Sequence, residues 1–407
     1  MYALLLSIIY IAFISLGLPD SLVGSGWPAM QADLGVPLWF AGFITMIIAG
    51  GTIVSSLMSE RLTRRLGVGL ITTISVGMTA AALIGFSFSG SFWMLCLWAI
   101  PYGLGAGAVD AALNNYVALH YAAKHMNWLH SFWGVGASIS PFIMGYAISS
   151  GAGWSSAYQT VGVVQVVLVA FLFLSLSLWR RGPHARQNIR EVESDAETEA
   201  PSAGHVPLSA ALRIPGVTLI LGAFFAYCAI ESTTILWAST YLVTERGIDA
   251  SVAATFAALF LLGITAGRFL SGFVADRLGD KALIRGGFLA NALGITMIAL
   301  PMPTDVLALA GLVIAGLGSA PIYPAIIHST PKNFGANNSQ AIIGIQMAAA
   351  YSGSTFMPPL FGALSSQIGM WIFPFYLALL VLLGMVLSER LNHRAARGEL
   401  AAASREL

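Results

Sequence analysis

The chain has 407 residues, of which 57% are hydrophobic and only 9% are charged, and its formal net charge is +1 at pH 7. Soluble domains carry roughly a quarter charged residues, so this composition excludes an ordinary soluble protein. The two cysteines, Cys96 and Cys228, fall in apolar stretches, where a thiol usually acts as a small buried apolar group. We expect no nucleic-acid partner and a chain that is surrounded by lipid.

Apolar runs of about 20 residues, enough to cross a hydrocarbon core as a helix, recur from one end of the chain to the other. The first run has no basic start and no small-residue cleavage site, so we interpret it as a transmembrane helix and not as a secretory signal. We predict an all-α integral membrane protein with twelve transmembrane helices. The expected spans are 3–27, 39–60, 68–90, 93–119, 127–150, 157–179, 217–243, 252–275, 283–301, 304–328, 337–362 and 369–389.

A polar stretch rich in Ala, Ser and Pro follows the sixth span and divides the spans into six and six. Its composition is that of a solvated linker. We predict an N-terminal six-helix bundle at 1–180, a cytoplasmic linker at 181–215, a C-terminal six-helix bundle at 216–390 and a cytoplasmic tail at 391–407. We expect the chain to act as a monomer.

The positions of the basic residues predict the orientation, because short cytoplasmic loops retain positive charge. If both termini are cytoplasmic, every Lys and Arg lies on the cytoplasmic side except Arg246, which is outside, and Arg268, which is within a span. We therefore predict a protein of the cytoplasmic membrane, plasma or bacterial inner, with both termini in the cytoplasm.

The two halves carry a related loop sequence, "SLMSERLTRR" at 56–65 and "GFVADRLGDK" at 272–281. This repetition indicates an internal duplication, so the two bundles should be pseudo-symmetric. The second copy resembles the loop signature of the major facilitator superfamily, in which this loop is associated with gating. The alternative is that these charges stabilise the helix ends by interacting with the helix dipoles, without any gating role. The candidate gating residues are Glu60, Arg61, Arg65, Arg268, Asp276 and Arg277.

Three acids, Asp20, Asp110 and Glu231, fall deep within the predicted spans. A charged acid at that depth costs about 2.5 kcal/mol or more, so each is a functional candidate. We interpret all three as candidates for proton coupling, and the alternative for each is a structural hydrogen bond between helices.

The surroundings of these acids are also polar or small. Asn114 lies one helical turn after Asp110, on a face that Gly103 and Gly107 continue. Pro19, beside Asp20, is expected to bend the first helix and free backbone groups there. Tyr227 lies one turn before Glu231.

Neutral polar and aromatic side chains near these acids are candidates for binding a substrate. Helix pairing and aromatic belts at the membrane surface are the competing explanations. The candidate substrate-binding residues are Asn114, Asn115, His130, Trp133, Tyr227, Trp237, Gln346 and Tyr323.

Three stretches, "GLGAGAVDAALN" (103–114), "NWLHSFWGVGA" (127–137) and "GLGSAPIYPAI" (316–326), resemble the fucose/galactose/glucose proton symporter branch of that superfamily. The resemblance implies the major facilitator fold. It places Asp110 at the acid of the fourth helix, which handles protons or substrate, and matches Asp20 approximately to an acid of the first helix. His130 stands where the family pattern carries Gln, and Trp133 where it carries Asn.

The resulting hypothesis is a secondary transporter that works by alternating access and couples a sugar or similar small polar solute to protons. The open alternatives are proton-coupled efflux of lipophilic or organic ionic compounds, sodium-coupled sugar uptake, and a receptor or sensor on a transporter scaffold. The sequence has no Gly-Lys dipeptide for a phosphate loop and no zinc-protease motif, so we expect no enzyme. We expect no cofactor beyond the proton gradient, with sodium as the alternative coupling ion.

Overall fold

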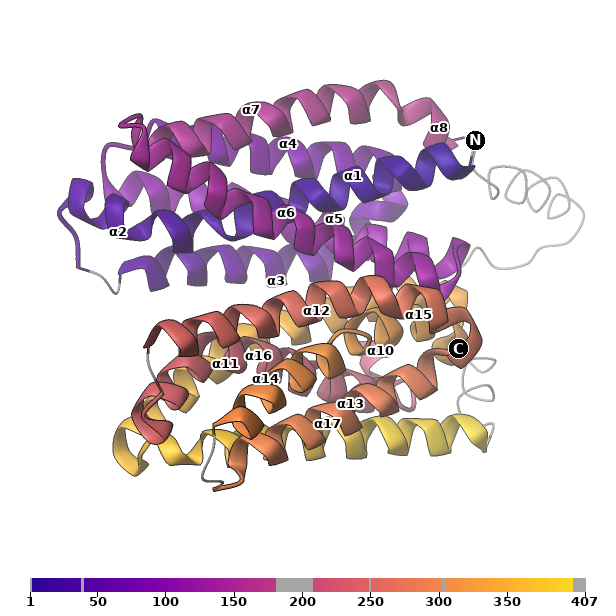
Figure 1. The fold of residues 1–407 in the computed structure, drawn as a ribbon. Coiled ribbons are helices and arrows are strands. Elements are labelled where there is room, and N and C mark those ends of the chain that lie inside the picture. Colours follow the sequence, from indigo (N-terminus) through magenta and orange to yellow (C-terminus); the bar gives the residue numbers. More distant parts are fainter. Residues whose placement is uncertain (1, 38–39, 181–207, 249, 302–304, 398–407) are drawn as a thin grey trace, which may run out of the picture. The chain divides into compact units, whose positions relative to one another are not determined.

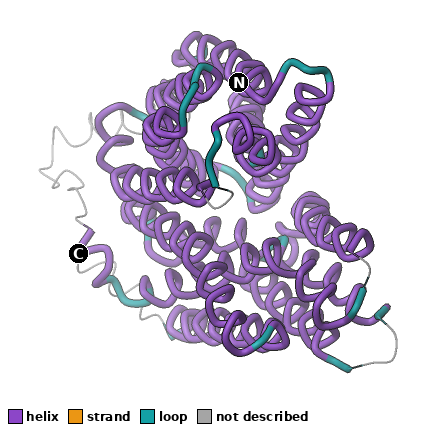
Figure 2. The backbone as a smooth tube through the Cα atoms, turned by 90° about the vertical axis from the view of Figure 1, so that its left-hand side faces the viewer, coloured by secondary structure: helices purple, strands orange, loops and turns teal. Residues whose placement is uncertain are grey.

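The computed structural model describes residues 2–37, 40–180, 208–248, 250–301 and 305–397. Within these ranges the chain consists of helices joined by short connections, without strands (Figures 1 and 2). The helices before the gap at 181–207 are α1 (Tyr2–Asp20), α2 (Leu22–Leu34), α3 (Ala41–Leu66), α4 (Val68–Ser87), α5 (Phe92–His120), α6 (Ala123–Ser149), α7 (Gly153–Leu174) and α8 (Leu176–Arg180). Those after it are α10 (Leu208–Arg213), α11 (Val217–Arg246), α12 (Ala250–Leu278), α13 (Asp280–Ala299), α14 (Val306–Ser319), α15 (Ile322–Phe334), α16 (Ala336–Ile368), the 3-10 helix η2 (Met370–Ile372) and α17 (Phe373–Ala396).

Ten stretches of the described chain are long and apolar enough to cross a membrane, and α1 with α2, like α14 with α15, forms one of them. The more polar helices α6 and α16, with 27 and 33 residues, are also long enough to cross. Together they make the twelve predicted spans. Large apolar side chains such as Trp93, Phe142 and Leu174 are 77%, 79% and 78% exposed, which suits lipid and not water. The protein is an all-α integral membrane protein.

Contacts divide the described residues into two compact units. The first unit contains the residues up to Leu113 and those from Phe132 to the end of α8. The second unit contains Asn114–Ser131 and the residues from Leu208 onward. In the first unit α4 packs along α7, and in the second α11 packs along α16 and α13 along α14.

Parts of the predicted domain scheme lie outside the described residues, namely 181–207 of the linker and 398–407 of the tail. The remaining part of the predicted linker includes the short helix α10.

The two related loops have the same backbone geometry, which agrees with an internal duplication. Gly67 joins α3 to α4 at φ 77° and ψ 157°, and Gly279 joins α12 to α13 at φ 76° and ψ 159°. A positive φ of this kind favours glycine, because a side chain would be strained there. When the two quoted loop sequences are compared position by position, Thr63 stands opposite Gly279, but Thr63 lies within α3. The glycine of the first loop comes one helical turn later.

The first membrane-crossing helix is interrupted at Ser21, between α1 and α2, as the nearby proline predicts. Pro19 has no N–H to bond the carbonyl four residues earlier, which is that of Ser15. The side chain of Gln165 on α7 donates to this carbonyl at 2.8 Å instead. The break leaves Asp20 at the end of α1, within the membrane-crossing stretch.

Candidate functional site

The carboxylate of Asp20 has two side-chain donors in the first unit. The hydroxyl of Tyr102 on α5 donates to Oδ1 at 2.9 Å, and the indole Nε1 of Trp133 on α6 donates to Oδ2 at 2.9 Å. Asp20 itself remains exposed, whereas Tyr102 is buried. The arrangement presents an exposed residue whose carboxylate is oriented by two neutral groups.

Two glycines bring α1 and α6 into backbone contact and so place Trp133 beside Asp20. A Cβ on Gly17 would lie 2.1 Å from the carbonyl oxygen of Trp133, and a Cβ on Gly136 would lie 2.1 Å from that of Ile14. Neither position tolerates a side chain without separating the helices, since a backbone atom cannot move aside as a side chain can. The short helix-to-helix distance is therefore part of the site.

Asp110 lies on α5 with only 9% of its surface exposed. The glycines on its helix face serve packing: a Cβ on Gly103 or Gly107 would lie 2.2 or 2.1 Å from the carbonyl oxygen of Ile48 or Thr52 on α3. These two glycines therefore lie on a surface where α5 packs closely against α3. Whether Asp110 carries protons stays a prediction.

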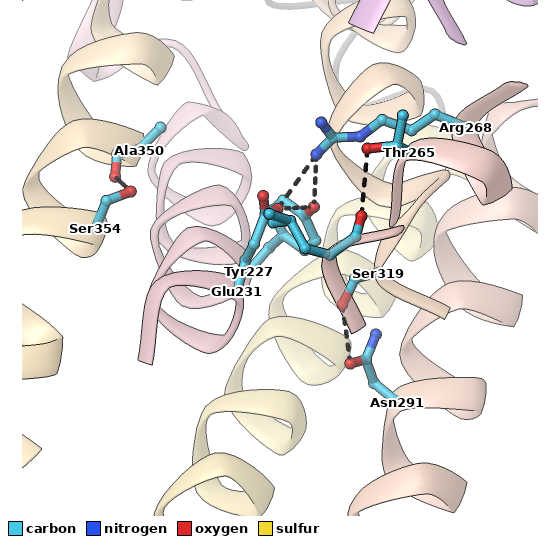
Figure 3. Close-up of polar contacts among 9 residues, drawn as sticks. Tyr227, Glu231, Thr265, Arg268, Asn291, Ser319, Ala350 and Ser354 are labelled. Atoms are coloured by element: carbon cyan, nitrogen blue, oxygen red, sulfur yellow. Dashed lines mark hydrogen bonds and ion pairs between the residues drawn. The ribbon is translucent and has the colours of Figure 1, made fainter. Parts of the chain in front are cut away.

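In the second unit, Glu231 forms a compact polar triad with Tyr227 and Arg268 (Figure 3). The hydroxyl of Tyr227, one turn earlier on α11, donates to Oε2 of Glu231 in a short hydrogen bond. Nη2 of Arg268 on α12 lies 3.2 Å from that same oxygen and 3.2 Å from the Tyr227 hydroxyl. The side chain of Arg268 is 3% exposed and that of Glu231 is 15% exposed. Arg268, which the sequence offers as a gating candidate, forms an ion pair with Glu231, and its gating role stays a prediction.

Aromatic and polar groups continue from this triad within the second unit. The ring of Tyr323 on α15 lies under the guanidinium of Arg268, with 5.8 Å between Cζ and the ring centroid. The ring centroid of His130 lies 4.5 Å from that of Tyr323. Nε2 of His130 is 3.0 Å from the amide oxygen of Asn114. Four predicted residues, Tyr227, Tyr323, His130 and Asn114, thus belong to one cluster around Arg268.

The other predicted substrate residues have separate partners. Gln346 is fully buried on α16 and accepts from Thr330 at 3.0 Å, while its Nε2 has no partner among the described residues. Asn115 accepts from Ser339 at 2.6 Å. Trp237 donates to the carbonyl of Pro358 at 2.9 Å. These bonds join helices.

The two signature loops form ion pairs. Glu60 pairs with Arg64 one turn away at 3.5 Å. Asp276 accepts from the backbone N–H of Lys124 at 3.2 Å and lies 3.6 Å from its Nζ. The candidate gating residues Arg61, Arg65 and Arg277 are exposed.

Sequence reasoning missed several groups in these sites. Tyr102 follows Pro101 in an apolar run. Nothing in that stretch distinguishes it from the other aromatic residues of the chain. The partners of His328 gave no signal in the sequence: Nδ1 lies 2.8 Å from Asp280, and Nε2 lies 3.3 Å from the carbonyl oxygen of Tyr121. The partners of Tyr102 and His328 lie far away in the sequence. A local sequence pattern therefore does not predict these contacts.

Comparison with known proteins agrees with this architecture. The family model of the Major Facilitator Superfamily matches residues 9–255 and 219–403. The chain belongs to this superfamily and is an integral membrane transporter.

Individual relatives are distant. Bypass of stop codon protein 6 of Saccharomyces cerevisiae is 25% identical over 66% of this chain, which spans 56% of that longer relative. The probable sulfoacetate transporter SauU of Cupriavidus necator is 24% identical, covering 76% of this chain and 74% of SauU. The solved structure of the superfamily transporter FucP, elsewhere described as the fucose:proton symporter of E. coli, has a TM-score of 0.77 and 16% identity, over 95% of this chain and 98% of FucP. The structural likeness shows the shared fold.

Proposed function

We propose that this transporter is a symporter that couples the uptake of a sugar or similar small polar solute to protons, across the cytoplasmic membrane. The observation that carries the proposal is the Asp20 carboxylate, which is exposed at a helix break and has two neutral donors. An acid in contact with solvent can exchange its proton, and its change of charge can bias two conformations of the protein. FucP, whose fold this chain shares, is named as a fucose:proton symporter.

The donors around Asp20 favour a proton over sodium as the coupling ion. Tyr102 and Trp133 direct an O–H and an N–H at the two carboxylate oxygens. A sodium ion needs several oxygen lone pairs directed toward it, and the indole N–H of Trp133 supplies none. The proton gradient is thus the proposed energy source, without a further cofactor.

The remaining parts of the proposal follow from the sequence. The cytoplasmic position of both termini follows from the distribution of Lys and Arg. A monomer in the bilayer, with a small-molecule substrate and without nucleic acid, is the proposed working form.

The test is proton uptake by proteoliposomes that are challenged with hexoses, deoxyhexoses, polyols and organic ions, in the presence or absence of sodium. We expect a solute-triggered proton signal that Asp20→Asn abolishes and that needs no sodium. Asp110→Asn, tested beside it, decides whether the second acid is also on the proton path.

Asp33→Asn is the matched control for Asp20→Asn, because Asp33 also accepts from a tryptophan, Trp154, at 2.8 Å. It should retain the signal. A response to lipophilic ions alone would support efflux, a strict need for sodium would support sodium coupling, and no transport of any solute would support a receptor or sensor. Each of these results contradicts the proposal.

A further inference from the structure

Gln165 on α7 is a buried amide that bonds two other helices of the first unit. Its Nε2 donates to the backbone carbonyl of Ser15 on α1 at 2.8 Å, and its Oε1 accepts from the hydroxyl of Thr79 on α4 at 2.8 Å. Gln165, Ser15 and Thr79 are 1%, 3% and 2% exposed. Water is therefore largely excluded from both bonds, and leaving a polar group unpaired there is costly.

The two partners also fix the orientation of the Gln165 amide. If the oxygen and nitrogen of the amide exchanged places, the oxygen would face the carbonyl oxygen of Ser15, and two acceptors cannot bond each other. The Thr79 hydroxyl supplies a hydrogen to the amide oxygen on the other side. The amide N–H is thus directed at α1 with the help of a third helix.

The carbonyl that Gln165 bonds belongs to the turn that leads to Asp20. Pro19 has no N–H to donate to this carbonyl, so the turn lacks one backbone hydrogen bond. A helix bends readily where such a bond is missing. The direction of the last turn of α1, which ends at Asp20, therefore depends on contacts from other helices. Gln165 supplies one of them at the position of the missing bond.

The direction of this turn decides whether Asp20 reaches its two donors. Tyr102 on α5 and Trp133 on α6 each donate at 2.9 Å, and they donate to different oxygens of the carboxylate. Hydrogen bonds weaken steeply when their distance or angle departs from the ideal. A small rotation of the last turn would thus move at least one carboxylate oxygen away from its donor.

We propose that Gln165 is a positioning residue for Asp20. By replacing the bond that Pro19 cannot make, it holds the last turn of α1 in the direction in which Tyr102 and Trp133 both meet the carboxylate. It acts through the Ser15 carbonyl. The use of this arrangement in proton exchange rests on the proposed symport function, whereas the positioning itself does not.

The test is the infrared band of the ionised Asp20 carboxylate, which shifts when the carboxylate gains or loses a hydrogen-bond donor. The band is identified by its absence from Asp20→Asn, at about pH 9, where an aspartate is ordinarily ionised. Trp133→Phe and Tyr102→Phe calibrate the shift for the loss of one donor. We expect Gln165→Leu to shift the band in the same direction as these variants and to lower the thermal unfolding midpoint.

Restoring the backbone bond should remove the need for Gln165. Pro19→Ala supplies an N–H to the Ser15 carbonyl, so adding Gln165→Leu to Pro19→Ala should cause little further shift of the band. A substitution whose effect depends on a second position indicates that the two residues are coupled. If Gln165→Leu alone does not fold, the double variant should fold and keep the band of Pro19→Ala.

Tyr376→Phe is the matched control. Tyr376 on α17 also donates to a carbonyl of another helix that contains prolines, that of Met357 on α16, at 2.9 Å. Its loss should leave the Asp20 band unmoved. An unmoved band in Gln165→Leu, or an equal shift in the presence and absence of Pro19, would overturn the inference.

Transport measurements separate this inference from the proposed function. We expect Gln165→Leu to reduce accumulation driven by a pH gradient about fivefold, the factor that corresponds to one hydrogen bond, and to reduce the exchange of labelled for unlabelled solute less. An equal loss of both would contradict the inference. The band is measured without a solute, so a shifted band in a protein that takes up no protons would contradict the symport and support the positioning role.

Discussion

Asp20 in the first unit and Glu231 in the second are both carboxylates within membrane-crossing helices, but their partners differ in kind. Asp20 is exposed and accepts from two neutral donors, Tyr102 and Trp133. Glu231 is mostly buried and pairs with the guanidinium of Arg268. Two neutral hydrogen bonds accompany the first carboxylate, whereas the second, which is mostly buried, has a cation beside it. Asp20 is therefore the carboxylate that we propose as the proton carrier, and Glu231 is the anion of a mostly buried ion pair.

The largest expected effect on stability comes from removing the cation Arg268 from its ion pair with Glu231. Arg268→Met leaves the Glu231 carboxylate mostly buried without its counter-charge, and we expect a loss of about 3 kcal/mol in the free energy of unfolding. The measurement is thermal unfolding in detergent. Adding Glu231→Gln should restore most of the stability, and a single variant as stable as the native protein would show that water already compensates the pair.

The next effect concerns the close contact between α1 and α6, which places Trp133 beside Asp20. Gly17→Ala places a Cβ 2.1 Å from the carbonyl oxygen of Trp133, so α1 and α6 must separate, at a cost of about 2 kcal/mol. Transport should fall as Trp133 moves away from Asp20. Gly24→Ala is the control, since a Cβ there meets nothing within 4 Å. Equal behaviour of the two variants would contradict the close contact.

A smaller effect is expected for a donor to the exposed acid. Trp133→Phe removes the N–H that donates to Asp20, and we expect a loss of about 1 kcal/mol in stability, as for a single hydrogen bond. Solute-driven proton uptake should weaken, and Tyr102→Phe should weaken it similarly. Proteoliposome uptake at matched protein content measures both. Uptake that survives in both variants would show that Asp20 needs no positioning.

The smallest effect should come from an ion pair outside both sites. Arg285 and Glu389 join α13 to α17 by two hydrogen bonds. Exposed pairs contribute little because water screens the attraction. Arg285→Gln should leave the unfolding midpoint and transport nearly unchanged. A loss as large as that of Arg268→Met would mean that ion pairs in this protein do not differ by burial.

The sequence predicts the local features of this molecule and not the distant contacts. Twelve spans follow from apolar runs, and the Tyr227–Glu231 contact follows from a spacing of one helical turn. The donors to Asp20 lie 82 and 113 residues away, and Arg268 lies 37 residues from Glu231. Hydrophobic periodicity shows which face of a helix is buried but not which helix covers it. That choice depends on packing, such as the contact that Gly17 and Gly136 permit.

The most direct test of proton exchange at Asp20 compares two modes of transport in Asp20→Asn. Counterflow exchanges labelled for unlabelled solute without net proton movement, whereas accumulation driven by a pH gradient requires a proton to bind and leave. We predict that Asp20→Asn retains counterflow and loses gradient-driven accumulation, while Asp33→Asn retains both. Accumulation by Asp20→Asn at the native level would contradict the assignment of proton exchange to this carboxylate.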